Sequence, residues 1–204
     1  MLMLAFAIGA TAQSEYNNLY YVFIDITDPE LVDSYKKKIK DAIPEMVSKS
    51  RVKDGNGIEI KFFAITNLQQ GARASFKITP REISFFESKY KRPDEIDDAM
   101  VRIPGILKRF KKAEYPHTRI VDAIQQEMDK YKSTKAKNKT IIVFSDLFEN
   151  KSTHDEEKLD WKNIYFVRGI SEPLNQSYVD LGDEWQMYWK KRIPNVKIST
   201  ELEL

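Results

Sequence analysis

The sequence predicts an α/β fold with a doubly wound, mostly parallel central sheet, one antiparallel edge strand and helices on both faces. Two unbroken apolar runs, residues 20–24 and residues 141–144, are rich in aromatic and β-branched side chains. Such runs are typical of strands buried on both faces of a parallel sheet. Amphipathic helical patterns alternate with strands along the chain, as parallel connections require. Oxygen-bearing side chains follow both runs directly, at the edge where open α/β sheets place their ligand sites.

Composition narrows the classes of function. The chain has 204 residues, of which 42% are hydrophobic and 31% charged, and this fits one domain of ordinary size with a real core. There is no cysteine, so disulfides, thiolate metal sites and cysteine nucleophiles are excluded. The two histidines argue against a histidine-based zinc site. The net charge is 33 − 31 = +2, which gives no reason to expect nucleic acid as a partner.

The N-terminal segment differs in character from the rest. An apolar run over residues 2–8 is followed by Ala10-Thr11-Ala12, whose small residues suit an export cleavage site. We interpret residues 1–12 as a secretory signal peptide; the other interpretation is a buried strand or helix. No other apolar stretch approaches the length that spans a bilayer. We therefore expect a bacterial protein, periplasmic or secreted, with no transmembrane segment in the mature chain and a single domain over residues 19–200.

A helix is predicted after the first strand. Residues 28–30 (Asp-Pro-Glu) have the composition of a helix start, with an N-cap acid, a proline in the first turn and a second acid near the positive end of the helix dipole. Apolar side chains recur at helical spacing over residues 31–46, and the lysines between them form a solvated face. We expect Pro44 to kink or end this helix.

The remaining patterns complete the sheet and its helices. Residues 58–66 predict a second strand, the alternating residues 72–79 predict an edge strand, and residues 81–93 predict irregular surface structure. The three tryptophans are interpreted as core or helix-packing residues. Further elements are predicted in chain order: an interrupted helix over 94–110, an amphipathic helix over 120–131, a strand over 164–167, a helix over 183–192 and a last strand over 196–198.

Three segments bring oxygen side chains to one edge of the predicted sheet. Asp25 and Thr27 follow the first strand, Thr118 precedes the helix that starts near residue 120, and Asp146 follows the strand at residues 141–144. Carboxylates and hydroxyls without histidine or cysteine are the ligands of a hard divalent cation such as Mg²⁺. Two carboxylates can act through bound water while hydroxyls bind the ion directly.

The order and spacing of these residues are similar to those of the von Willebrand factor A (VWA) domain and its metal-ion-dependent adhesion site. That family carries Asp-x-Ser/Thr-x-Ser after its first strand, a threonine before a central helix, and an aspartate, often in Thr-Asp-Gly, after its fourth strand. The resemblance covers roughly residues 19–170 and implies a VWA-like, Rossmann-like winding with a bound Mg²⁺, Mn²⁺ or Ca²⁺. It implies these site residues: Asp25, Thr27, Thr118 and Asp146 at the metal, with Asp28 and Ser145 as accessory oxygens.

The sequence departs from the family pattern at two places. Pro29 stands where the third ligand of the first motif belongs, so one direct oxygen is missing and the metal site is degenerate. Leu147 replaces the glycine of Thr-Asp-Gly. An interpretation without metal also stands: Thr118 and Asp28 act as helix caps, and the two strand-end aspartates hydrogen-bond the neighbouring loops.

The resemblance implies a binding protein. In the family, the open position of the cation accepts an acidic side chain of a protein partner. We therefore expect an exported, non-enzymatic protein that binds a protein partner through the carboxyl-end face of its sheet, with a weak Mg²⁺-dependent site. One alternative is a metal-dependent phosphoryl-transfer hydrolase with Asp25 as nucleophile, although Thr27 stands where its second aspartate belongs. The other is a metal-free scaffold subunit of an envelope assembly.

Overall fold

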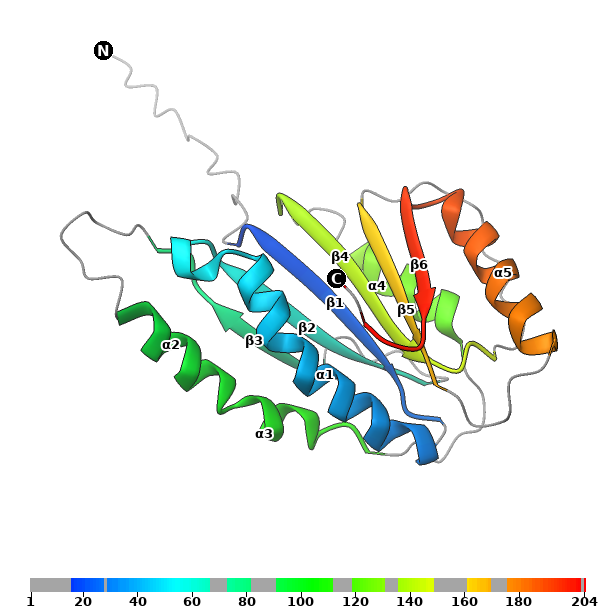
Figure 1. Ribbon diagram of the computed structural model, residues 1–204, viewed down its shortest axis with the longest axis horizontal. Helices are drawn as coiled ribbons and strands as arrows, with labels where there is room; N and C mark the ends of the chain where they lie inside the picture. The colour runs from blue at the N-terminus through cyan, green and yellow to red at the C-terminus, as the bar shows by residue number, and fades with distance from the viewer. Residues whose placement is uncertain are drawn as a thin grey trace, which may run out of the picture.

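The central element of the computed structural model is a six-stranded sheet in the order β3-β2-β1-β4-β5-β6 (Figure 1). The structure describes residues 16–27, 29–66, 73–81, 91–111, 119–130, 136–148, 161–169, 176–202 and 204. The strands have these bounds: β1 Asn18–Asp25, β2 Ile58–Ile65, β3 Ala74–Ile78, β4 Asn138–Ser145, β5 Asn163–Arg168 and β6 Asn195–Ser199. The helices have these bounds: α1 Pro29–Lys49, α2 Lys91–Met100, α3 Ile103–Leu107, α4 Ile120–Lys130 and α5 Gln176–Lys190, with a short 3₁₀ turn at Val52–Asp54.

The predicted sheet class is confirmed. β1 pairs in parallel with β2 on one side and with β4 on the other, and the parallel ladder continues through β5 to β6. β3 is the antiparallel strand, at the edge beside β2. Every residue of β1 is buried, because an unbroken apolar strand in the middle of a parallel sheet is covered on both faces.

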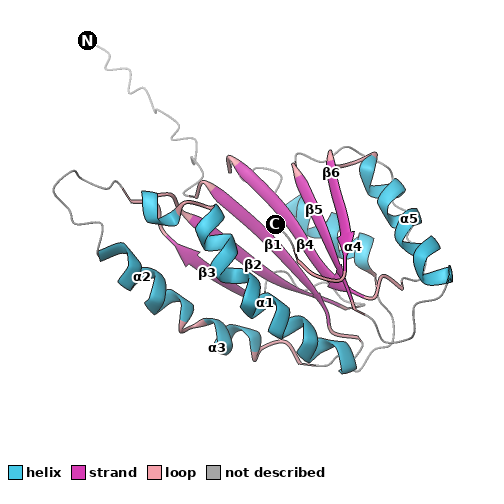
Figure 2. Ribbon diagram, viewed as in Figure 1, coloured by secondary structure: helices cyan, strands magenta, loops and turns pink. Residues whose placement is uncertain are grey.

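Helices cover both faces of the sheet, and each face has its own core (Figure 2). Alternate residues of β1 enter different cores, since successive side chains of a strand point to opposite faces. Tyr20, Val22 and Ile24 join the core under α1, α2 and α3. Leu19, Tyr21 and Phe23 join the core under α4 and α5, together with the three tryptophans Trp161, Trp185 and Trp189. The core role predicted for the tryptophans is therefore confirmed.

Of the two outcomes expected at Pro44, a kink or an end of the helix, the end is wrong. α1 continues to Lys49 with Pro44 inside it. An interior proline costs about 3 kcal/mol, because it removes one backbone hydrogen bond and crowds the preceding turn. Met46 and Val47 lie beyond Pro44 and are buried in the core, and burial of two such side chains contributes about 1.5–3 kcal/mol each. Core packing therefore outweighs the local penalty. The lysine-rich face of α1 is solvated as predicted, with Lys37 and Lys40 exposed.

Two further boundaries differ from the predictions. α2 begins at Lys91, within a stretch predicted to be irregular. Pro93 lies in the first turn of this helix. Backbone N–H groups in the first turn have no acceptor within the helix, so a proline there loses no hydrogen bond. α5 begins at Gln176, seven residues before the predicted start. The first part of α5 includes Gly182, at which an added Cβ would lie 3.3 Å from Arg168 Nη1.

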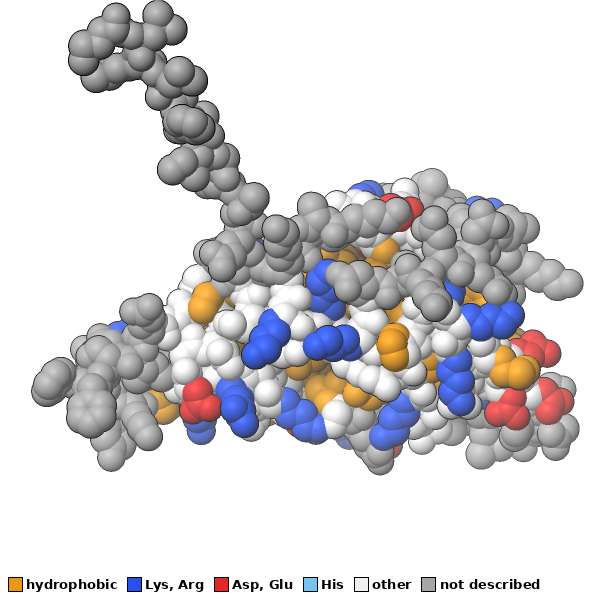
Figure 3. Space-filling model, turned by 90° about the horizontal axis from the view of Figure 1, so that it is seen from above, with side chains coloured by type: hydrophobic (Ala, Val, Ile, Leu, Met, Phe, Trp, Pro, Cys, Tyr) orange, Lys and Arg blue, Asp and Glu red, His pale blue; other side chains and the backbone are white. Residues whose placement is uncertain are grey.

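The surface seen from above carries many separate basic side chains (Figure 3). Lys and Arg groups on this face are spaced by apolar and uncharged atoms, so they do not merge into one basic patch. Within the described residues, no helix is both long and apolar enough to cross a membrane. Residues 1–12, the predicted signal peptide, lie outside the described residues and remain a prediction.

Candidate functional site

The carboxyl ends of β1 and β4 place two predicted site residues side by side. Ile24 lies opposite Phe144 in the parallel ladder, so the next residues along the two strands, Asp25 and Ser145, reach the same edge of the sheet. Asp25 is 2% exposed and Ser145 is fully buried. A buried carboxylate must be hydrogen-bonded to be tolerated, so its partners decide what the site can do.

Both carboxylate oxygens of Asp25 accept hydrogen bonds. The Thr27 backbone N–H and hydroxyl donate to Oδ1, at 3.0 Å and 2.6 Å. The Ser145 hydroxyl donates to Oδ2 at 2.8 Å. The Thr27 contacts close a tight Asx turn at the exit of β1, while the Ser145 contact ties that turn to β4. These charge-assisted bonds stabilise the carboxylate and fix the two loops relative to each other.

The loop after β4 exposes an aromatic side chain to solvent. Asp146 Oδ1 accepts a hydrogen bond from the Phe148 N–H at 3.0 Å and lies 3.5 Å from Ser145 Oγ. The Leu147 N–H donates to Ser145 Oγ at 3.1 Å. Leu147 is buried and has a left-handed backbone with φ of 69°, which is uncommon for a residue other than glycine. The turn leaves Phe148 57% exposed beside the half-buried Asp146.

The end of β5 closes this edge of the sheet. The Gly169 N–H donates to the Ser145 carbonyl at 3.1 Å. A Cβ at Gly169 would lie 2.5 Å from Leu31 Cδ1 and 2.9 Å from Tyr35 Cζ on α1, so a side chain at this position would have to displace those of Leu31 and Tyr35. Arg168, opposite Ser145 in the ladder, is 5% exposed and places a buried cation at the same edge.

The structure brings together four of the six predicted site residues. Asp25, Thr27, Ser145 and Asp146 form one hydrogen-bonded cluster, whereas Thr118 and Asp28 lie outside the described residues. Pro29 is the first residue of α1 and supplies no side-chain oxygen, as expected. The role of these residues as metal ligands stays a prediction.

The chemistry of the cluster fits a hard cation, because its side-chain donors are carboxylate and hydroxyl oxygens. Among the residues that the structure describes, no group of three or more His, Cys, Asp or Glu side chains is placed to hold a metal ion. A cation here would therefore need the hydroxyls of Thr27 and Ser145 as well as the two carboxylates. The hydroxyl hydrogens point to Asp25, and a hydroxyl oxygen that donates still has lone pairs for a ligand bond.

Sequence reasoning missed three features of the site: the bridge that Ser145 makes to Asp25, the exposure of Phe148, and the buried Arg168. The departure from the Thr-Asp-Gly pattern at Leu147 gave no indication that Phe148 is exposed. The buried arginine had no signal beyond its position at the end of an apolar strand.

Comparisons with known proteins identify a fold. No model of a protein family matches the sequence, and no curated protein matches it. The fold is similar to that of a minor pilin. An aspartate-to-alanine mutant of the PilB minor pilin from Streptococcus sanguinis superposes with a TM-score of 0.59 and 11% identity, over 93% of this chain and 58% of the pilin. The chain thus spans little more than half of that structure.

A second solved structure is less similar. It contains the three N-terminal domains of the type V pili tip protein Mfa5 from Porphyromonas gingivalis, with a TM-score of 0.41 and 9% identity over 67% of this chain and 21% of that one. At 11% identity, the similarity to PilB shows only that the two proteins share a fold.

Proposed function

We propose that this chain is an exported, non-enzymatic binding protein of a bacterial surface assembly, which holds a protein partner at the carboxyl end of its sheet. The observation that carries this proposal is the Asp25–Ser145–Asp146 cluster with the exposed ring of Phe148 beside it. An exposed aromatic side chain next to a fixed polar cluster is typical of interface anchors. The fold similarity to a minor pilin, a protein of pili, supports the surface setting.

Two observations support a VWA-like winding for the domain. The strand order β3-β2-β1-β4-β5-β6, with β3 antiparallel, is the order of a doubly wound sheet. Leu147, where the family carries glycine, adopts the left-handed backbone that glycine adopts most readily. The carboxyl-end cluster then corresponds to the adhesion site of the family.

A divalent cation is proposed as a second component of the site. Mg²⁺, Mn²⁺ or Ca²⁺ would be held by Asp25, Thr27, Ser145 and Asp146, together with Thr118. The cation would supply an open coordination position for an acidic side chain of the partner. The residues of this chain orient that position: Asp25 fixes both hydroxyls, and Phe148 provides apolar contact area at its rim.

The hydrogen bonds of Asp25 favour a metal-free version of the same function. Thr27 and Ser145 satisfy both of its carboxylate oxygens, so the two loops hold their places without a cation. The scaffold interpretation therefore differs from the adhesion-site interpretation only in its dependence on metal. The same contacts disfavour the hydrolase, because a carboxylate that is 2% exposed and hydrogen-bonded on both oxygens is poorly placed to attack a phosphoester.

Metal dependence is tested by thermal melting with EDTA and with millimolar Mg²⁺ or Mn²⁺. A working site raises the melting temperature by mass action. Asp146→Asn is the informative variant, because an amide oxygen still accepts the Phe148 N–H while the charge is lost; it should abolish the metal response. Asp183→Asn on exposed α5 is the matched control and should keep it. A wild-type protein with no response supports the metal-free version.

Partner binding is tested by cross-linking in envelope fractions of the native host. Phe148→Ser should abolish recovery of the main cross-linked partner. Met187→Ser, a similarly exposed apolar side chain on α5, should retain it. Equal recovery with both variants would contradict the proposed face, and release of phosphate from p-nitrophenyl phosphate that is lost in Asp25→Asn would contradict a non-enzymatic role.

A further inference from the structure

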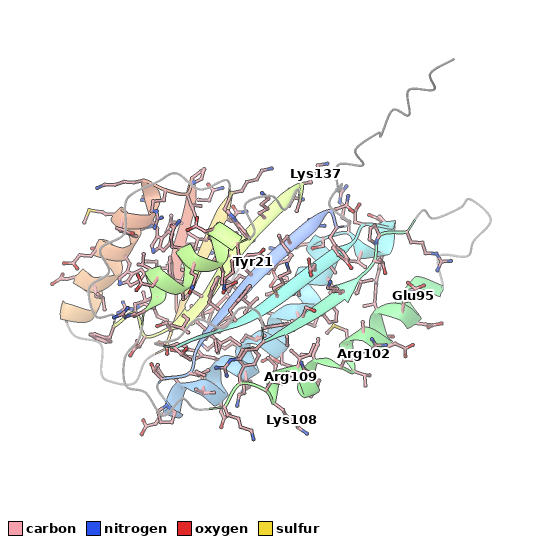
Figure 4. All side chains as sticks on the ribbon, turned by 180° about the vertical axis from the view of Figure 1, so that it is seen from behind. Tyr21, Glu95, Arg102, Lys108, Arg109 and Lys137 are labelled. Carbon is pink, nitrogen blue, oxygen red and sulfur yellow. The ribbon has the colours of Figure 1, made fainter. Side chains whose placement is uncertain are left out.

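Helices α2 and α3 form a continuous arm along the edge strand β3, away from the carboxyl-end cluster. Ile96 of α2 and Ile103 and Leu107 of α3 are buried in the core beneath α1. The opposite face of the arm is open to solvent. Figure 4 shows Glu95, Arg102 and Lys108 following one another along the arm at the margin of the molecule, with Arg109 beside Lys108 on the side of the strands.

Charge is segregated along this arm. Residues 94–98 contain four acids and no base, whereas residues 99–111 contain four bases and no acid; the first turn of α2 adds two bases, Lys91 and Arg92. The acids are Asp94, Glu95, Asp97 and Asp98, and the bases after them are Arg102, Lys108, Arg109 and Lys111. In the described part of the chain, Glu95 pairs with Arg81 at 2.7 Å, and no ion pair occurs for the other three acids or for Lys108 and Lys111. From residue 94 to residue 111 the arm thus has an acidic half and a basic half, whose charges are largely uncompensated by ion pairs.

An apolar centre lies between the two halves. Val101 is 78% exposed, more than the other exposed large hydrophobic side chains of the described residues, Phe148 and Met187. Beside it runs an open groove of about 490 Å³ lined by Met100, Val101, Ile103 and Pro104 of the arm and by Lys40, Asp41 and Pro44 of α1. Asp94, Asp97, Asp98 and Val101 share one helical face, because their spacing is i, i+3, i+4 and i+7.

We propose that this arm is a self-association surface, on which a second copy of the chain docks about a two-fold axis that passes near Val101. A surface with the order acidic, apolar, basic is complementary to itself only when reversed, and a two-fold axis across the arm performs that reversal. The acidic half of each copy then faces the basic half of the other, twice per dimer. The two Val101 side chains meet at the centre and pack toward the grooves. This inference concerns residues outside the carboxyl-end cluster and goes beyond the proposed binding function.

Charge reversal gives a stringent test by sedimentation velocity over a range of protein and salt concentrations. Wild-type protein should dimerise, and dimerisation should weaken from about 50 mM to about 500 mM NaCl because exposed charges are screened. The acid-reversed variant Asp94→Lys/Asp97→Lys/Asp98→Lys makes both halves basic. The base-reversed variant Arg102→Glu/Lys108→Glu/Lys111→Glu makes both halves acidic. Each should lose self-association by about tenfold or more.

Mixing the two reversed variants decides the geometry. In a two-fold complex both contacts become complementary again, so the mixture should form a heterodimer although neither variant dimerises alone. Val101→Asp should also weaken the dimer about tenfold or more, because it buries a charge at the centre. Met187→Asp is the matched control and should leave the dimer intact. All substituted side chains are exposed, so circular dichroism should show unchanged folding.

A wild-type protein that stays monomeric at low salt and high protein concentration would overturn the proposal, because the arm would then not bind a second copy of the chain. A dimer that survives both charge reversals and Val101→Asp would overturn it equally, since association would then use another face. Neither result affects the Phe148 experiment, because the two surfaces share no residues.

Discussion

The two ends of the central strands are both polar, but they are built from different chemistry. At the amino end, β1, β4, β5 and β6 each begin with asparagine. Asn138 Nδ2 donates to Asn18 Oδ1 at 2.9 Å, and Asn195 Nδ2 donates to Asn163 Oδ1 at 3.0 Å. At the carboxyl end, hydroxyls surround the buried carboxylate of Asp25. One end is closed by neutral amides and the other by a charge.

The contrast separates a structural role from a functional one. An amide carries both donor and acceptor, so asparagines on neighbouring strands satisfy each other and pin the register. A carboxylate only accepts, and burying it costs free energy that the hydroxyl donors must offset. The carboxyl end also presents an exposed aromatic ring and a strained backbone at Leu147, and strain of this kind clusters at functional sites. At the amino end Arg51, next to Ser50, also has a left-handed backbone, with φ of 51°. Among the described residues the exposed aromatic ring therefore distinguishes the carboxyl end, and the backbone strain does not.

The largest effect is expected at the carboxyl end. Asp25→Ala should lower the free energy of unfolding by about 3 kcal/mol, because the Ser145 hydroxyl and the Thr27 hydroxyl and N–H lose their acceptor together. Urea denaturation measures it. Asp146→Ala is the control at the same edge of the sheet: Asp146 accepts the Phe148 N–H in an exposed contact, and its loss should cost about 0.5–1 kcal/mol. Equal costs for the two variants would mean that Asp25 is not the centre of the cluster.

A smaller effect is expected at the amino end. Asn18→Ala removes a hydrogen bond to the Ser50 carbonyl at 3.1 Å and the acceptor for Asn138. It should cost about 1–2 kcal/mol, because these groups are neutral and Asn138 can turn to water. The exposed Asn195→Ala should cost less than about 0.5 kcal/mol. If Asn18→Ala proved as costly as Asp25→Ala, the proposed difference between the two ends would disappear.

The fold could be predicted from sequence wherever one physical effect dominated. The runs at residues 20–24 and 141–144 have no plausible place except a doubly covered strand, and α4 carries a regular apolar stripe. Predictions were less sharp where two effects competed. Local backbone chemistry argued for a kink or an end of the helix at Pro44, and the helix continues beyond it to bury Met46.

The candidate site was less accessible to sequence reasoning. Asp25 and Asp146 could be placed because parallel strands end at the same edge. Ser145 had been given only an accessory role, since its bridge to Asp25 depends on the register between β1 and β4. The amide pairs of the amino end were missed for the same reason. Asn18 and Asn138 are 120 residues apart, and only the ladder shows that they meet.

The smallest predicted effect concerns pH and again lies toward the amino end. Tyr20 on β1 shares a hydrogen bond of 3.3 Å with Ser50 Oγ. Burial raises the pKa of Tyr20 above its ordinary value of 10.0, and the hydrogen bond with Ser50 lowers it by less. A raised pKa in the folded state means that the folded chain holds this proton more tightly. The stability from Tyr20 is therefore complete below pH 10 and is lost as the pH rises through the folded-state pKa.

The measurement is the difference in free energy of unfolding between wild type and Tyr20→Phe, from about pH 8 to about pH 11.5. The difference cancels the titration of groups that both proteins share, such as the many lysines. Wild type should be slightly more stable than the variant up to about pH 10, because it keeps the hydroxyl hydrogen bond, and should lose this advantage at higher pH. Ser50→Ala removes the one hydrogen bond that favours the ionised form, so it should steepen the alkaline loss. A difference that stays constant across the range would mean that the Tyr20 hydroxyl is open to water, and that the amino end is less tightly closed than its amide pairs imply.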